Sequence, residues 1–484
     1  MIGHSLASRE RGMLTFGKHC LSSPAKVEFP LQLVRTTPAS IPLGNEWPLR
    51  RLLLWSLLTL AAIVFTGPGN LRAFLSTKSN LVDFHQEWIS AKFYLDGLPV
   101  YSRIEEGMLR YQKLRRPPGG GPFLDYNAHP PTSVLIAIPF GHFDYGTAGV
   151  VWNVFSIALL IPVIRTILVQ LEIPFHPGML LRILTLLLIC EPLYQQIFYG
   201  QLNLILLWLI VAAWSAERSN RPISAGFFLG TATVLKLFPA LLFLHFLISG
   251  RWRLLAAGGV TILGWTALTA ALVGTDAYRE YFAVVVPHLS EYKTRWFNLS
   301  IHGFWARLFD GPSEFGKSFP IAYAPWLATA LTAFCDAIIL IVLLVLERRS
   351  NTREQRDLSF SLCLVAALLL SPLTWAHYVV LLFLPLVLLW RNARNESNAY
   401  RVAFAIWVAL LWIPAGLFWM LAIPELRKLP WWQATAHPWQ VLTAISLQFY
   451  ALVGVFVLGA IAALRAIRRS KSTGPAPIHS EVPP

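Results

Sequence analysis

Apolar runs separated by short polar or basic connections fill most of the chain between residues 52 and 464. Runs of this length cross a bilayer as helices, and several shorter ones do so once their flanks are included. Every backbone polar group must be satisfied inside the membrane, so helices are the expected spanning structure. The pattern predicts an all-α polytopic membrane protein with about twelve transmembrane helices.

Basic residues indicate the orientation of these helices. Arg50 and Arg51 precede the first apolar run, and Arg348 and Arg349 begin the most basic connection. Because Lys and Arg concentrate in cytoplasmic loops, both termini are expected in the cytoplasm of a cell-membrane protein. The predicted divisions are a loosely ordered cytoplasmic tail over 1–50, a membrane domain over 51–464 whose sizeable first extracytoplasmic loop covers 68–147, and a basic cytoplasmic tail over 465–484.

Three pairs of short apolar segments turn on the same, extracytoplasmic face. Their apices lie near Gly200, Lys236 and His377. Broken backbone at membrane depth is tolerated where it is buried in protein or lines a cavity. We therefore expect a cavity that opens to the outer leaflet.

Composition agrees with a membrane protein, with 55% hydrophobic residues, 13% charged residues and a mean hydropathy of +0.54. The 40 Lys and Arg exceed the 25 Asp and Glu, but the excess lies mainly in tails and loops. It favours membrane topology and attraction to anionic headgroups over nucleic-acid binding. Cys20, Cys190, Cys335 and Cys363 show no metal-ligand spacing, and the last three are interpreted as packing residues.

Asp83 follows the first span in an aromatic segment. A carboxylate there can act as general base on a sugar hydroxyl. Glu87 lies four residues on and would share its helical face as a partner or competitor. The alternative is that Asp83 is a solvated loop charge or a helix cap.

The apices carry the remaining candidate chemistry. Lys236 stands between Leu235 and Leu237, where a buried ammonium needs an anion or a dipole, and a lipid phosphate would serve. Its alternative is snorkelling to the interface. Gln201 and Asn203 offer amides for sugar hydroxyls, although capping or interhelical bonding would explain them equally well. His377 can bond a phosphate or a sugar, or be an ordinary interfacial histidine.

Common catalytic signatures are missing from the sequence. There is no P-loop, no glycine-rich dinucleotide fingerprint, no HExxH and no GxSxG elbow. No acidic cluster suggests a divalent metal, so we expect neither metal nor cofactor. The sequon Asn298-Leu299-Ser300 is a short pattern that arises often by chance, and it is given no weight as a modification site.

A set of ordered motifs resembles glycosyltransferase family 87, which includes the mycobacterial polyprenol-phosphate-mannose-dependent mannosyltransferases. The resemblance extends from about residue 50 to 460. Each motif is weak singly, but their order and spacing are fairly specific. They are Asp83, Trp88, Ala91, Gly97 and Tyr101; the segment Tyr126-Asn127-Ala128-His129-Pro130-Pro131; Gly200-Gln201-Leu202-Asn203; Lys236-Leu237-Phe238-Pro239; Arg251-Trp252-Arg253; and Ser371-Pro372 with His377-Tyr378.

The resemblance implies a GT-C type bundle that moves a hexose, with inversion, from a polyprenyl-phosphate sugar to an extracytoplasmic glycolipid or glycan. By resemblance Asp83 would be the catalytic base, and Lys236 and His377 would hold the donor phosphate. The residues implied to bind the sugar or acceptor are Gln201, Asn203, Glu87, Tyr101 and Asn298. The stretch from Pro117 to Gly121 departs from the family pattern as an insertion.

Two rival functions remain open from the sequence. A transporter or lipid flippase would place its polar groups near the bilayer midplane, often with internal repeats. Here the polar apices lie to one side, but Glu191, Gln195 and Gln196 sit within a span and could belong to a pathway. A non-catalytic subunit of an envelope-assembly complex is the other alternative.

Overall fold

The computed structural model describes residues 48–75, 83–114, 125–311, 317–394, 396–430 and 433–472. Some sequence-based predictions therefore lie outside the described residues. These are the tail over residues 1–47, the insertion from Pro117 to Gly121, and residues 473–484 of the C-terminal tail.

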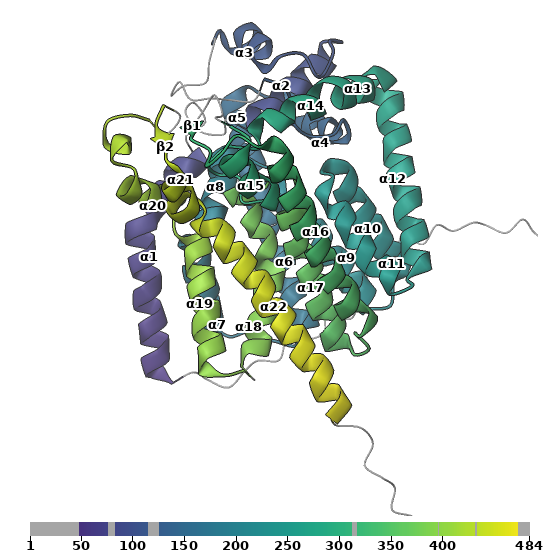
Figure 1. Ribbon diagram of the computed structural model, residues 1–484. Helices are drawn as coiled ribbons and strands as arrows, with labels where there is room; N and C mark the ends of the chain where they lie inside the picture. Colours follow the sequence, from purple (N-terminus) through teal and green to yellow (C-terminus); the bar gives the residue numbers. More distant parts are fainter. Residues whose placement is uncertain are drawn as a thin grey trace, which may run out of the picture. The chain divides into compact units, whose positions relative to one another are not determined.

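Helices make up most of the described chain, which confirms the all-α, polytopic prediction (Figure 1). Within the described ranges, six helices are long and apolar enough to cross a membrane. They are α1 (Leu49–Leu75), α5 (Tyr145–Ala158) continued by α6 (Leu160–Gln170), α12 (Trp252–Val273), α16 (Pro325–Arg348), η4 (Ala376–Leu382) continued by α18 (Phe383–Ala393), and α22 (Leu447–Ser472).

Two further pairs of helices are sharply bent. The first is α7 (Pro177–Leu188) with α8 (Glu191–Tyr199), bent by 60°, and the second is α19 (Asn398–Trp412) with α20 (Ala415–Ala422), bent by 82°. Pro192 and Pro414 stand at these bends, where proline removes a backbone donor. If each pair is one span, the described residues contain up to eight.

The remaining helices, which the sequence-based count includes as crossings in short hairpins, are mostly short. The helices between the long spans are α9 (Asn203–Arg218), α10 (Pro222–Leu235), η1 (Phe238–Leu241), α11 (Leu242–Ile248) and α17 (Arg353–Leu370). With 14 residues, α10 is too short to span a bilayer core of about 30 Å at about 1.5 Å per residue. Six to eight segments among the described residues are therefore long and apolar enough to cross a membrane, and the total of about twelve stays a prediction.

The first helix extends into the predicted extracytoplasmic loop over 68–147. Although Pro68 and Gly69 follow the first apolar run, α1 continues through them to Leu75. The chain then forms α2 (Phe84–Leu95), α3 (Ile104–Gln112) and α4 (Thr132–Gly141) before α5 begins at Tyr145. The apolar α4 packs on α2, so the described parts of this segment form a folded cap over the bundle (Figure 1).

Other short elements gather at the same end of the bundle as α2 to α4 (Figure 1). The strands β1 and β2 pair in parallel and join segments far apart in the sequence. The elements are α13 (Thr275–Glu280), η2 (Tyr281–Val285), α14 (Val286–Leu289), η3 (Ser290–Tyr292), α15 (Ile301–Phe309), β1 (Lys317–Ser318), η5 (Pro424–Arg427), β2 (Thr435–Ala436), α21 (Pro438–Gln440) and η6 (Val441–Ile445).

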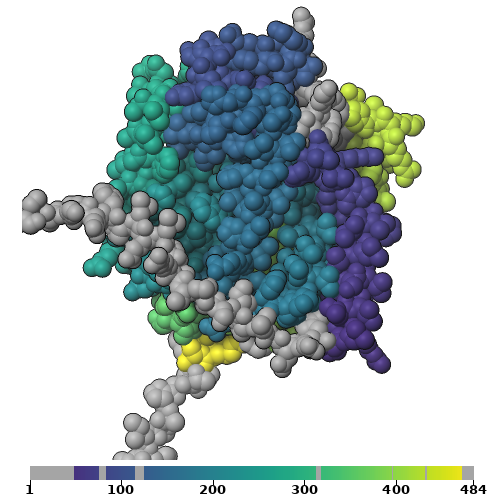
Figure 2. Space-filling view, turned by 180° about the vertical axis from the view of Figure 1, so that it is seen from behind, coloured from purple at the N-terminus to yellow at the C-terminus, as the bar shows by residue number. Residues whose placement is uncertain are grey.

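The helices differ in how much of their apolar surface is covered. On α9, residues such as Leu206, Leu207 and Ile210 are fully buried, so this helix forms the centre of the core. On α1, most side chains face outward, and Phe65 is 83% exposed. Figure 2 shows α1 as an outer column along one edge. Such a helix, apolar but exposed, is suited to contact with lipid.

Basic connections meet at the end opposite to α2–α4. Arg218 pairs with Asp357, and Arg353 donates to the Arg218 carbonyl at 2.7 Å. Arg391 donates to the Leu171 carbonyl at 2.8 Å. These contacts join four connections that are distant in sequence. In Figure 1, α1 begins and α22 finishes at this end, which we call the basic end.

Candidate functional site

Asp83 lies directly before α2, at the end of the bundle that faces away from the basic end. Its side chain makes no capping hydrogen bond to α2, so the helix-cap alternative does not apply. Instead, the carboxylate accepts a hydrogen bond from Gln201 Nε2 at 2.7 Å. Burial raises the pKa of Asp83 to about 6, against the lowering effects of the Gln201 hydrogen bond and the Lys236 charge.

The turn between α8 and α9 supplies the amides. Gly200 has a φ of +68°, a left-handed conformation that suits glycine and reverses the chain after α8. Gln201 then bridges Asp83 and Lys236, because its Oε1 lies 3.5 Å from Lys236 Nζ. Asn203 is fully buried; its Oδ1 accepts from Lys236 Nζ at 3.2 Å, and its Nδ2 donates to Gln196 Oε1 at 2.9 Å.

Lys236 occupies the break between α10 and η1 and is only 7% exposed. Its Nζ lies 3.7 Å from the centroid of the Tyr378 ring, which provides a cation–π contact. Among the described residues it makes no ion pair, and its polar contacts are with the neutral amides of Gln201 and Asn203. A buried ammonium in contact with amides and an aromatic ring, and with no carboxylate of the described residues in direct contact, can bind an anion.

His377 lies at the start of η4 and is buried between Tyr199 and Tyr378, with ring centroids at 5.6 Å and 5.0 Å. Its carbonyl accepts from Asn203 Nδ2 at 3.4 Å. Its Nε2 is buried and makes no hydrogen bond to any described residue. Buried polar atoms are nearly always paired, so this nitrogen is available for a ligand.

One cavity of about 1090 Å³ joins these groups. Asp83, Gln201, Lys236 and His377 line it, although they come from four different segments of the chain. The three apices near Gly200, Lys236 and His377 therefore meet around a shared cavity, as the hairpin pattern predicts. The other charged or polar lining residues are Gln86, His129, Gln195, Tyr199, Tyr281, Ser290, Tyr292, Lys293, Arg295, His302, Ser371 and Tyr378.

Four other residues predicted to bind sugar or acceptor do not line this cavity. Asn203 lies behind the cavity wall and is hydrogen-bonded to Lys236 and Gln196, and Glu87 contacts His129. Tyr101 donates to the His129 carbonyl at 2.6 Å. Asn298 donates from Nδ2 to the Pro372 carbonyl at 2.9 Å, which joins the chain before α15 to the chain after α17. In this structure the four side chains support the wall of the cavity rather than face its interior.

Sequence reasoning assigned no role to two groups that line the cavity. Tyr378 places its aromatic ring against Lys236, and His129 also lines the cavity. Gln196, which the sequence associated with a transport pathway, instead accepts a hydrogen bond from Asn203 Nδ2. Tyr378 and His129 stood inside motifs used for the family resemblance but carried no signal of their own. Within the described residues, no group of three or more His, Cys, Asp or Glu side chains could hold a metal ion.

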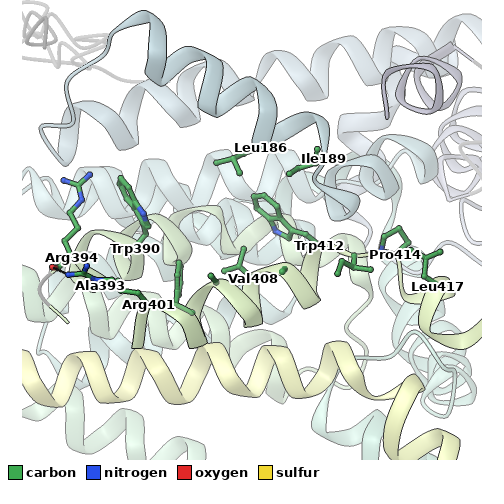
Figure 3. A pocket seen from close by; sticks show the side chains of 14 residues that line it. Leu186, Ile189, Trp390, Ala393, Arg394, Arg401, Val408, Trp412, Pro414 and Leu417 are labelled. Atoms are coloured by element: carbon green, nitrogen blue, oxygen red, sulfur yellow. Dashed lines mark hydrogen bonds between the residues drawn. The ribbon is translucent and has the colours of Figure 1, made fainter. Parts of the chain in front are cut away.

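A second cavity, of about 920 Å³, lies between α7, α18, α19 and α20 (Figure 3). Its lining is mostly apolar, as with Leu186, Val408 and Leu417. Arg394 and Arg401 lie together at one end (Figure 3). None of the described side chains that line it is a carboxylate or an imidazole, so it offers no general base. The candidate catalytic groups among the described residues are therefore those of the first cavity.

Taken together, the first cavity pairs a base with an anion site. Asp83 can accept a proton, and Lys236 and His377 provide donors for a negatively charged leaving group. The amide bridge through Gln201 sets the base and the cation side by side. This combination suits transfer of a group from a phosphate-bearing lipid to a hydroxyl.

Comparison with known proteins identifies the family. The sequence profile of glycosyltransferase family 87 matches residues 127–372, half of the chain. The chain belongs to glycosyltransferase family 87. It is thus a membrane glycosyltransferase, rather than the transporter, flippase or non-catalytic subunit that the sequence alone left open.

Curated relatives agree with this assignment. A polyprenol-phosphate-mannose-dependent alpha-(1-2)-phosphatidylinositol mannoside mannosyltransferase of Mycobacterium tuberculosis is 28% identical over 89% of this chain and 97% of its own length. The enzyme of that name from Mycolicibacterium smegmatis is 25% identical over 85% of this chain and 90% of its own.

A pentamannoside-acting mannosyltransferase of Mycolicibacterium smegmatis, also dependent on polyprenol-phosphate-mannose, is 25% identical over 64% of this chain and 72% of its own length. No solved structure matches the chain.

Proposed function

We propose that the protein transfers a mannosyl group from a polyprenyl-phosphate mannose to a hydroxyl of a mannosylated glycolipid, such as a phosphatidylinositol mannoside. The relatives of M. tuberculosis and M. smegmatis carry this donor and acceptor class in their names, and they align over most of both chains. The observation that carries the proposal is the buried Lys236 ammonium beside Asp83 in a single cavity.

The reaction would be a single displacement. Asp83 takes the proton of the acceptor hydroxyl as that oxygen bonds to the anomeric carbon of the donor sugar. The bond between that carbon and the phosphate oxygen breaks, and the polyprenyl phosphate leaves with the electron pair. Lys236 and His377 stabilise its charge, while Gln201, bonded to both Asp83 and Lys236, holds these two side chains in position. Attack from the face opposite the leaving group inverts the anomeric configuration.

The charge of the phosphate complements the amine. Besides the charge of the nearby Asp83, Lys236 relies on two amide oxygens and the Tyr378 ring, which compensate only part of the cost of burying a charge. A phosphate at this point would also lie close to His377 Nε2, whose bonding capacity is unused among the described residues. Lys236 and His377, which could both bind a phosphate, thus line the same cavity.

The membrane arrangement is also part of the proposal. The Arg-rich connections at the basic end would lie in the cytoplasm, with both termini, and the cavity would open on the extracytoplasmic side. About twelve crossings result if the shorter helices pair as hairpins around the cavity, as in a GT-C type bundle. The apolar outer face of α1 would contact lipid directly.

The test is a transfer assay with purified protein in nanodiscs. Radiolabelled polyprenyl-phosphate mannose and a phosphatidylinositol mannoside should yield a labelled, larger glycolipid. GDP-mannose in place of the lipid donor should yield none. Transfer from the nucleotide sugar, or none from the lipid donor by well-folded protein, would contradict the proposal.

A further inference from the structure

The loop before α4 is fixed onto α2 by several hydrogen bonds. Asn127 Nδ2 donates to the Gln86 carbonyl at 3.2 Å and to Ser90 Oγ at 3.1 Å. The Ala128 N–H donates to Gln86 Oε1 at 2.8 Å, and the His129 N–H donates to Asn127 Oδ1 at 3.0 Å. The position of His129 is therefore set by α2, the helix that begins beside Asp83.

The His129 side chain is also fixed by a contact with α2. Its Nδ1 contacts Glu87 Oε1, and the Glu87 side chain is 1% exposed. Glu87 does not line the cavity, whereas His129 does. Glu87 Oε2 makes no hydrogen bond to any described residue, so among those residues His129 is the partner that compensates this buried carboxylate.

The pairing determines which ring nitrogen can meet a ligand. Burial lowers the pKa of His129 below its ordinary value, against the opposing effect of the Glu87 carboxylate, and the Lys236 charge lowers it further. A neutral imidazole whose Nδ1–H donates to Glu87 carries its lone pair on Nε2. That nitrogen can accept a hydrogen bond from a hydroxyl but cannot donate one to a phosphate.

Two pairs of cavity-lining residues come from different parts of the fold. Lys236 follows α10 and His377 lies at the start of η4, and both suit the donor phosphate. Asp83 precedes α2 and the loop that carries His129 is bonded to α2, so these two residues share the element that positions the base. A lone-pair acceptor on the part of the cavity wall that α2 positions fits a sugar hydroxyl near the one that reacts.

We propose that His129 Nε2 accepts a hydrogen bond from a hydroxyl of the acceptor sugar, and that Glu87 is the positioning residue that fixes the tautomer and direction of this ring. The proposal rests on the proposed function, because it assigns the acceptor to the wall that carries Asp83. It also gives Glu87 a role behind the cavity instead of direct contact with sugar.

Steady-state kinetics with polyprenyl-phosphate mannose and a phosphatidylinositol mannoside test the proposal. His129→Ala should raise the KM for the acceptor about tenfold, the loss of roughly one hydrogen bond, and leave the KM for the donor within about twofold. Glu87→Ala should show the same split. Glu87→Gln should restore much of the acceptor KM, because its amide oxygen still accepts from Nδ1–H.

Matched controls are available nearby. The exposed His142, at the end of α4, and the exposed Glu105, on α3, should tolerate alanine without a change in either KM. An unchanged acceptor KM in folded His129→Ala, or equal rises in both KM values, would overturn the proposal. Wild-type protein that transfers nothing would instead overturn the proposed function.

A measurement on the wild type covers the case in which the variants do not fold. Diethyl pyrocarbonate modifies neutral imidazole, and peptide mass spectrometry reports modification at His129. The phosphatidylinositol mannoside alone should protect His129, and polyprenyl phosphate alone should not. Protection by polyprenyl phosphate and none by the acceptor would place His129 on the donor side and contradict the proposal.

Discussion

The pKa of Asp83 is set by opposing effects, burial on one side and two neighbours that stabilise the carboxylate on the other. Burial raises its pKa to about 6, while the Gln201 hydrogen bond and the Lys236 charge oppose the rise. A carboxylate in this range is still ionised at neutral pH, yet it is more basic than an ordinary aspartate. The surroundings of this one residue thus favour the role of general base.

The pH profile should report this balance. Because the base must be ionised, kcat/KM should fall about tenfold per pH unit below an apparent pKa near 6. Gln201→Leu removes a hydrogen bond that favours the carboxylate, so the acid limb should move to higher pH. Profiles of wild type and variant in nanodiscs measure the shift. An acid limb that stays in place in a folded variant would contradict this electrostatic role of Gln201.

Lys236 should matter for the chemical step. Lys236→Met keeps the length and the aliphatic part of the side chain but removes the charge. We expect kcat to fall by a factor of about 100 or more, the usual effect of losing one hydrogen-bond donor that stabilises the transition state. The exposed Lys113 is the control, and Lys113→Met should keep wild-type kcat. A Lys236→Met enzyme with normal kcat and only a raised donor KM would show that the amine binds the ground state and the transition state equally, which would contradict a role in the chemical step.

At the scale of single elements, close packing between α10 and α12 supports the apex that carries Lys236. An added Cβ at Gly226 would lie 2.4 Å from the Leu254 carbonyl oxygen, and one at Gly230 would lie 2.8 Å from the Gly258 carbonyl oxygen. Two glycines one turn apart allow backbones to approach this closely. The short α10 is thus held in place by contact with the longer α12.

Gly226→Ala should therefore destabilise the protein by about 1–3 kcal/mol, since backbone cannot move aside as a flexible side chain can. Gly259, on the same α12, has no atom within 4 Å of an added Cβ, and Gly259→Ala should be neutral or slightly stabilising. Thermal unfolding in detergent, followed by tryptophan fluorescence, compares the two. Equal melting temperatures would refute the close-packing explanation.

Sequence patterns were most informative where one residue conflicted with its neighbours. Lys236 between Leu235 and Leu237 was such a conflict, and the structure places it in the cavity wall. Asn298 was a weaker inference, because an amide that joins two chain segments resembles an amide that binds a sugar until its partners are known. The link between Asp83 and Gln201, 118 residues apart, depends on tertiary packing that local patterns do not contain.

Across the whole molecule, sequence hydropathy located the helical segments but could not establish which of the short ones cross the membrane. Each predicted apolar run is helical where the structure describes it, yet six helices, or eight with the bent pairs, are clear spans among the described residues. The other helices include short ones such as α9 and α10, whose ends meet at the cavity through Asn203 and Lys236. Hydropathy averages cannot distinguish such hairpins from full crossings.

The proposed membrane orientation can be tested by thiol labelling. In a functional variant without native cysteines, Glu105→Cys on α3 should react with a membrane-impermeant maleimide in intact cells. Asn351→Cys, in the exposed connection before α17, should react only after permeabilisation. Both positions are exposed in the structure. The reverse labelling pattern would place the cavity on the cytoplasmic side.

The most direct test of Asp83 as the catalytic base is single-turnover transfer by Asp83→Asn in nanodiscs, with donor bound in excess. Asparagine preserves size but cannot take the proton, so the rate should fall by a factor of about 100 to 10,000 while the donor dissociation constant stays close to wild type. Asp276→Asn, a change at an exposed aspartate paired with Arg279, should transfer at the wild-type rate. A wild-type rate from folded Asp83→Asn would contradict the role of Asp83.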